Sequence, residues 1–75
     1  MKQLFAKFAI DDKLYPVIEC YWNTFNGILR TVTCTTPYDS DIPDMFFVFN
    51  VVNITQDKIE LELITNKNFK AEIQV

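Results

Sequence analysis

Two cysteines are the residues of this chain whose type and spacing could support chemistry, either as a disulfide or as a reactive thiol. Cys20 and Cys34 lie on either side of the single Asn26-Gly27 pair. If that pair forms a two-residue turn, the thiols fall on opposite faces of the hairpin, whereas a one-residue bulge makes them direct partners. Buried structural thiols are the favoured interpretation, and a disulfide and a reactive thiol stay open as alternatives.

Three closely spaced aspartates form the second candidate group. Asp39, Asp41 and Asp44 lie in the loop 37–44, which also holds two of the three prolines. Their carboxylates could converge on a hard cation such as Ca²⁺, but the ligand count is short and the glycine of a tight calcium loop is absent. The pattern therefore favours a solvated acidic loop, and we expect no metal.

This sequence offers few of the residues and motifs on which catalysis commonly depends. The chain contains no histidine, and it has one glycine, which excludes a glycine-rich phosphate loop. We therefore expect no enzymatic activity and no cofactor.

Aromatic residues gather around the middle of the N-terminal half and the loop after it. Tyr21 and Trp22 are neighbours in a predicted strand, so they must point to opposite faces. Rings in so small a domain more often fill the core, but exposed rings anchor protein interfaces. The candidate interaction residues are Tyr21, Trp22, Tyr38, Asp39, Asp41 and Asp44.

The elements that must position these residues are strands. Val, Ile, Thr, Tyr, Phe and Trp, which fit a pleated surface, account for 32 of the 75 residues. Turn residues divide the chain into six runs, and a helix over 2–12 is the competing prediction for the first of them. The expected fold class is all-β: one domain over 1–75, built as a small antiparallel barrel or two-layer sandwich in mainly hairpin order. The predicted strands are 3–10, 14–25, 28–36, 45–54, 58–64 and 69–75.

Apolar alternation predicts how these strands pair. With a turn at 11–13, Ala6 lies opposite Ile18 and apolar residues face one another. The strand 45–54 is apolar on both faces, which predicts a central strand covered on both sides.

The last two strands predict a hairpin with one apolar and one polar face. Pairing Glu62 with Lys70 favours a loop at 65–67. The need for a left-handed residue instead favours a loop at 66–68, with Asn68 in that conformation.

Charge and hydropathy exclude two classes of partner. Seven Lys and Arg stand against ten Asp and Glu, and the net charge is −3. The cations are scattered singly, whereas phosphate binding needs them clustered. The longest apolar run is broken by Asn50 and falls far short of the roughly 20 residues of a membrane helix. Lys7 interrupts the N-terminal apolar run, so no signal peptide is indicated and we expect a cytoplasmic protein that binds neither membrane nor nucleic acid.

A family resemblance adds to this interpretation. The run FAKFAIDDKLY at 5–15, followed by VIECY at 17–21 and by Phe25, resembles the opening hairpin of Hcp-like type VI secretion tube proteins. The likeness covers about half of the chain, which lacks the family's Gly-Arg-Pro-type loop. The resemblance implies a β-barrel whose edges or rim serve protein assembly, with no catalytic residues.

Three functions are compatible with these features. The leading hypothesis is a non-catalytic protein interaction or assembly module that contacts another protein or a second copy of itself. Under this hypothesis we expect the first and last strands to be sheet edges, where Lys7 and Pro16 would hinder unwanted pairing with other strands. The net charge and the loop 37–44 suggest the alternative of a small acidic inhibitor, of phage or mobile-element type, that blocks a basic site on a host or defence enzyme. A small-ligand-binding barrel is the third hypothesis, although Phe and Ile side chains leave little interior room.

Overall fold

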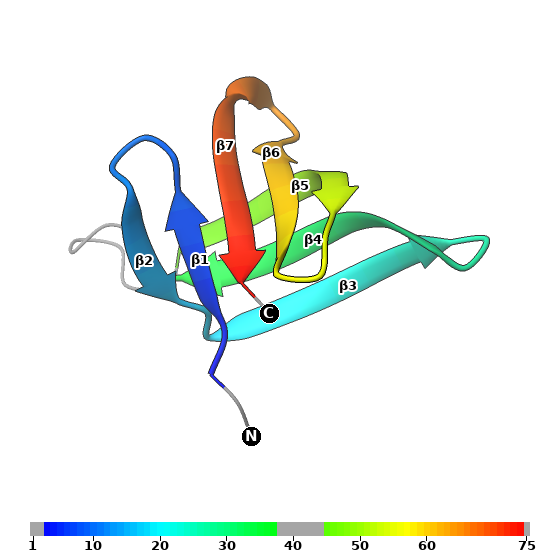
Figure 1. Ribbon diagram of the computed structural model, residues 1–75, viewed down its shortest axis with the longest axis horizontal. Coiled ribbons are helices and arrows are strands. Elements are labelled where there is room, and N and C mark those ends of the chain that lie inside the picture. The colour runs from blue at the N-terminus through cyan, green and yellow to red at the C-terminus, as the bar shows by residue number, and fades with distance from the viewer. Residues whose placement is uncertain (1–2, 38–44, 75) are drawn as a thin grey trace.

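A computed structural model gives the structure of residues 3–37 and 45–74. These residues form seven antiparallel strands in a single sheet that curls into a half-barrel (Figure 1), which confirms the all-β prediction. None of the described residues belong to a helix with the length and apolarity that a membrane crossing requires. The order across the sheet is β2-β1-β7-β6-β5-β4-β3. The strands are β1 (Phe5–Phe8), β2 (Lys13–Pro16), β3 (Glu19–Phe25), β4 (Ile28–Thr36), β5 (Met45–Ile54), β6 (Lys58–Leu63) and β7 (Asn66–Gln74).

The predicted strand 14–25 is bent into two, β2 and β3, which raises the strand count from six to seven. Only Val17 and Ile18 separate the two halves. The Val17 N–H donates to the Leu4 carbonyl at 2.9 Å, and the Ile18 N–H donates to the Thr35 carbonyl at 2.8 Å. The segment therefore pairs with β1 before the bend and with β4 after it. One stretch of chain joins the two ends of the sheet, and this makes the sheet curl.

A buried hydroxyl ties the same corner together. Thr36, at the end of β4, is fully buried, and its Oγ1 donates to the Pro16 carbonyl at 2.8 Å. Pro16 has no N–H to continue a strand ladder, so the chain can leave β1 at this point without losing a backbone donor. The hydroxyl therefore links the end of β2 to the far side of the sheet.

Aromatic rings fill the inner face of the curl. Phe8 of β1 lies 5.2 Å from Phe47, 6.4 Å from Phe49 and 5.4 Å from Phe69, measured between ring centroids. These partners belong to β5 and β7, so the rings join β1 to its neighbour β7 and to β5, which lies three strands away in the sheet. The buried apolar residues are Ala6, Phe8, Val17, Val32, Cys34, Phe47, Phe49, Ile59, Leu61, Ala71 and Ile73.

The first hairpin differs from the predicted register. Ala6 lies opposite Tyr15 rather than Ile18. The turn is longer than expected because Asp12 adopts a left-handed φ of 59° and its N–H donates to the Phe8 carbonyl at 2.8 Å. β1 therefore ends at Phe8, and the residues that follow leave the strand. The competing prediction of a helix over 2–12 is wrong for its described part.

β5 lies in the interior of the sheet, between β6 and β4, but it is covered on only one face. Phe49 is fully buried on the inner face, whereas Phe46 on the outer face is 66% exposed. Val52 is bulged out of the pairing with β6 and is 55% exposed. The prediction of cover on both faces is wrong because the described strands form a single layer. No described element packs over the outer face of β5.

The last hairpin confirms the predicted inner and outer faces, and it corrects the turn. Glu62 lies opposite Lys70, and their side chains form an ion pair at 3.3 Å. The register then shifts so that Leu63 faces Asn66, which matches neither predicted loop. Asn68 is not left-handed, and its N–H donates to the Asn66 side-chain oxygen at 3.0 Å. This side-chain acceptor stabilises the irregular start of β7.

Replacing a core ring should cost far more stability than replacing an exposed ring on the same strand. We expect Phe49→Ala to lower the free energy of unfolding by about 3–5 kcal/mol, because the ring is fully buried and leaves a cavity. The control Phe46→Ala should change it by less than about 0.5 kcal/mol. Urea denaturation followed by circular dichroism measures both. Equal losses for the two variants would contradict this assignment of inner and outer faces.

The corner hydroxyl can be tested without changing side-chain volume. Thr36→Val removes the donor to the Pro16 carbonyl, and we expect a loss of about 1 kcal/mol in the free energy of unfolding. Thr33→Val, on the outer face of the same strand, is the matched control and should stay within about 0.5 kcal/mol of the wild type. If both variants keep wild-type stability, the hydroxyl does not hold this corner.

Candidate interaction surface

β3 forms one end of the sheet and is paired on one side only, with β4. An edge strand presents backbone N–H and C=O groups that can pair with an added strand. β3 is seven residues long and contains neither proline nor lysine. The other edge, β2, has four residues and carries both Lys13 and Pro16. Of the two edges, β3 is therefore the longer one, and it lacks both lysine and proline.

The predicted sheet edges are wrong. β1 lies between β2 and β7, and β7 lies between β1 and β6, so the first and last predicted strands are interior. Lys7 therefore does not guard an edge, whereas Pro16 does lie on one. The cause is the pairing of β1 with β7, two segments from opposite ends of the sequence.

The aromatic side chains of β3 lie on both of its faces. Tyr21 is 59% exposed and Trp22 is 42% exposed. Trp22 faces Val32 on the inner side, and Tyr21 points to the outer side, where its hydroxyl donates to the Glu19 carboxylate at 3.4 Å. The prediction that one of the two rings lies outside the main core face is confirmed. Phe25, near the hairpin tip, is 64% exposed.

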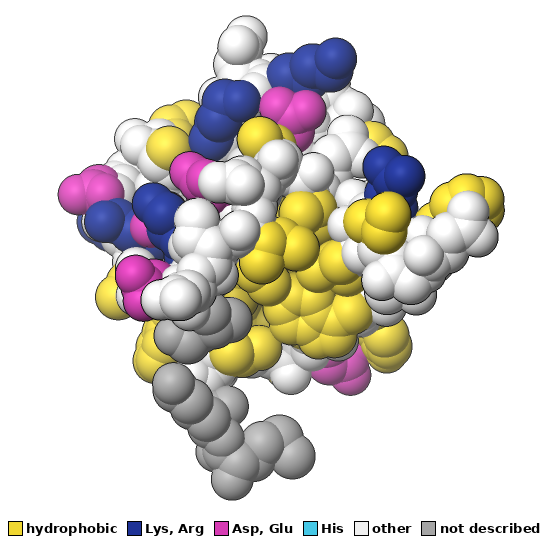
Figure 2. All heavy atoms as spheres, turned by 45° about the vertical axis from the view of Figure 1, so that its right-hand side comes forward, with side chains coloured by type: hydrophobic (Ala, Val, Ile, Leu, Met, Phe, Trp, Pro, Cys, Tyr) yellow, Lys and Arg dark blue, Asp and Glu magenta, His cyan; other side chains and the backbone are white. Residues whose placement is uncertain are grey.

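A row of apolar residues leads from the core to this edge along the inner face. Leu63, Phe49, Val32 and Trp22 are successive partners across β6, β5, β4 and β3. The β3–β4 hairpin projects away from the rest of the sheet (Figure 1). Hydrophobic side chains form one continuous patch beside this projecting arm (Figure 2). The free edge of β3 thus adjoins apolar surface.

The hairpin turn and a bulge decide where the two cysteines lie. Asn26 and Gly27 both have positive φ, 53° and 76°, as predicted for a two-residue turn. Arg30 has no partner on β3, because the register shifts beside it. This bulge makes Cys20 and Cys34 direct partners on the inner face, so the prediction of opposite faces, which assumed no bulge, is wrong.

Burial keeps both thiols protonated at neutral pH. It raises the pKa of Cys20 to about 11 and that of Cys34 to about 12, and the neighbouring Cys20 also contributes to the latter. A thiolate is the nucleophilic form of cysteine, so neither side chain is set up as a catalytic nucleophile.

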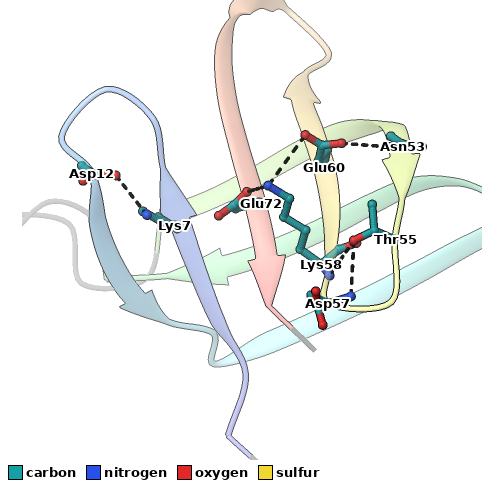
Figure 3. A network of polar contacts seen from close by, with 8 residues as sticks. All are labelled: Lys7, Asp12, Asn53, Thr55, Asp57, Lys58, Glu60 and Glu72. Carbon is teal, nitrogen blue, oxygen red and sulfur yellow. Dashed lines mark hydrogen bonds and ion pairs between the residues drawn. The ribbon is translucent and has the colours of Figure 1, made fainter.

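The outer face of β1, β7 and β6 carries paired charges around an open groove of about 540 Å³. Lys58 Nζ lies 3.1 Å from Glu72 and 4.0 Å from Glu60, and Lys7 lies 3.2 Å from Asp12 (Figure 3). Glu60 and Glu72 are direct cross-strand partners, an unfavourable arrangement of like charges that Lys58 offsets. Glu72 accepts a hydrogen bond from Lys58, and this bond raises the pKa of Lys58. These charged side chains pair with one another, so we interpret the groove as part of the folded structure and not as a binding site.

The remaining predicted site residues, Tyr38, Asp39, Asp41 and Asp44, lie outside the described residues. Within 3–37 and 45–74 no three His, Cys, Asp or Glu side chains are grouped to hold a metal ion. The acidic-inhibitor hypothesis depends on the loop 37–44 and stays a prediction.

No family model, curated protein or solved structure matches this chain. The resemblance to Hcp-like tube proteins therefore stays a prediction.

The Lys58 ion pair gives a titration test of the charged face. We expect Glu72→Gln to lower the pKa of Lys58 toward its ordinary value, because the charged hydrogen-bond acceptor is lost. Glu60→Gln is the control and should lower it less, since Glu60 lies farther from Nζ. Stabilisation through a raised lysine pKa is present below the ordinary lysine pKa and fades as the pH rises through the folded value. NMR titration of the lysine side chain measures both variants, and equal shifts would contradict the assignment.

Proposed function

We propose that this chain is a non-catalytic protein interaction module that binds an extended segment of a partner protein along the free edge of β3. The observation that carries the proposal is a seven-residue edge strand with no proline or lysine and with exposed rings on both faces. In strand addition, backbone hydrogen bonds supply affinity and side chains on alternate faces supply specificity.

The two faces of β3 define what the partner segment presents. A strand added beside β3 would place every second side chain on the inner face, next to Trp22 and the apolar row behind it. The side chains between them would lie on the outer face, near Tyr21 and Glu19. A segment with apolar residues on one face and neutral or basic residues on the other fits this arrangement. Exposed tryptophan and tyrosine are residue types that commonly dominate binding energy.

Two further features support a binding role over catalysis. The chain has no histidine, and burial raises the pKa of both thiols, so neither of these residue types supplies a side chain that exchanges protons near neutral pH. The ring cluster around Phe8 fills the inner face of the curl, which favours binding at an edge over binding in the interior.

A peptide selection on the intact chain tests the proposal. Random peptides displayed on phage are selected against the immobilised protein, and the recovered peptides are synthesised as probes. We expect alternating apolar residues in these peptides and slower amide hydrogen exchange in β3 on binding, because the free edge acquires backbone partners. Protection confined to strands other than β3 would reject the proposal.

A lysine placed on the edge should weaken this binding selectively. Tyr21→Lys introduces on β3 the kind of residue that blocks natural edges, and we expect a loss of about tenfold in peptide affinity, or about 1.4 kcal/mol. Phe46→Lys makes the same change of charge at a similarly exposed aromatic residue of the interior strand β5. Its affinity should stay close to that of the wild type in isothermal titration calorimetry. An equal loss in both variants would show that β3 is not the binding edge.

A further inference from the structure

Cys20 and Cys34 are far apart in the sequence and are direct partners in the fold. They face one another across β3 and β4 on the inner side of the sheet, and both are free thiols. Opposed residues of antiparallel strands have Cα atoms about 4.5–5.5 Å apart. Disulfides span Cα separations of about 4.4–6.8 Å. A disulfide between them is therefore compatible with the strand pairing as it stands.

We propose that Cys20 and Cys34 form a redox modification site, which a small-molecule disulfide such as oxidised glutathione converts into a reversible cross-strand disulfide. The two thiols differ in access. Cys20 is half-buried, so a small oxidant can reach it, whereas Cys34 is fully buried. Cys20 is therefore the attacking thiol, and Cys34 is the resolving thiol.

The reaction is two successive thiol–disulfide exchanges. The Cys20 thiolate, after losing its proton to solvent, attacks one sulfur of oxidised glutathione; the glutathione S–S bond breaks and one glutathione leaves as a thiolate. Cys34 then loses its proton, and its sulfur attacks Cys20 in the mixed disulfide, which expels the second glutathione. Two protein thiols are oxidised, and one glutathione disulfide is reduced to two thiols.

Burial of Cys20 limits the rate of the first exchange. Because burial raises the pKa of Cys20 to about 11, only a small fraction is thiolate at neutral pH. That fraction, and with it the rate of the first exchange, should rise about tenfold for each pH unit between about 7 and 9. The folded protein therefore reacts slowly at neutral pH and faster in mild base.

The disulfide would pin the edge strand to its neighbour. It closes the segment 20–34, which contains the Asn26-Gly27 turn and the bulged Arg30. A cross-link of this kind constrains the unfolded chain, so the oxidised protein should unfold at a higher urea concentration than the reduced protein. The inference depends on the register of β3 and β4 and stands independently of whether β3 binds a partner.

Tryptic mapping of the full chain provides a direct test. The native protein is incubated with glutathione mixtures of increasing oxidised fraction, and its remaining thiols are blocked with an alkylating agent. Trypsin cleaves after Lys13, Arg30 and Lys58, which places the two cysteines on separate peptides, 14–30 and 31–58. We expect mass spectrometry to find these peptides linked in the oxidised protein and separate after reduction. A linked product that appears only when denaturant is present would overturn the proposal.

Single variants separate the two roles. In Cys34→Ala we expect one glutathione to remain on Cys20, because no resolving thiol is present. In Cys20→Ala we expect no modification while the protein is folded, because Cys34 is buried. Stable glutathione on Cys20 of the wild type without the linked peptide, or disulfide-linked dimers in place of it, would overturn the proposal. The wild-type mapping decides the matter even if a variant fails to fold.

Discussion

The bend at Val17 and Ile18 is the constraint on which the rest of this structure depends. One segment of chain is hydrogen-bonded to β1 before the bend and to β4 after it, so the two ends of the sheet are covalently joined. A flat sheet of seven strands would place those ends far apart, at about 4.8 Å for each step between strands. The sheet must therefore curl, and the curl places Phe8 of β1 against Phe47 of β5. The aromatic core is a consequence of this closure.

The same bend leaves β3 free on one side. The pairing with β1 stops where the chain turns toward β4, and beyond that point no described strand lies on the open side of β3. Full closure of the barrel would have removed the edge, as it does in larger barrels. A half-barrel of this size retains it, and here the retained edge carries Tyr21 and Trp22. The proposed binding edge and the fold thus have a common physical origin.

The surface divides into two chemically different regions. The outer face of β6 and β7 is a lattice of ion pairs in which Lys58 offsets the opposed Glu60 and Glu72. Among the described residues, the outer face of β3 and β4 carries Tyr21 and Thr33, without such ion pairs. Exposed charges and their water resist being covered by a partner, because desolvation is costly. A partner that covers the region beside β3 therefore meets a lower desolvation cost than one that covers the ion pairs of β6 and β7. This difference supports the position proposed for the interface.

The amino-acid sequence by itself determined the features that depend on neighbours along the chain. β-Branched and aromatic residues specified strands, Asn26-Gly27 specified a two-residue turn, and alternation specified the inner and outer faces of the last two strands. Adjacency alone required Tyr21 and Trp22 to point in opposite directions.

Only the tertiary structure decided which strands are edges, where the shared strand bends and whether the two cysteines meet. The pairing of β1 with β7 uses the backbone N–H and C=O groups that all residues except proline carry, so no side-chain pattern predicts it. A single bulged residue, Arg30, shifts the register and brings Cys20 opposite Cys34. Side-chain alternation reports the parity of a strand, whereas register depends on the twist and closure of the whole sheet. That difference is the physical reason why the strands could be predicted from the sequence, whereas the free edge of the sheet and the pairing of the two thiols could not.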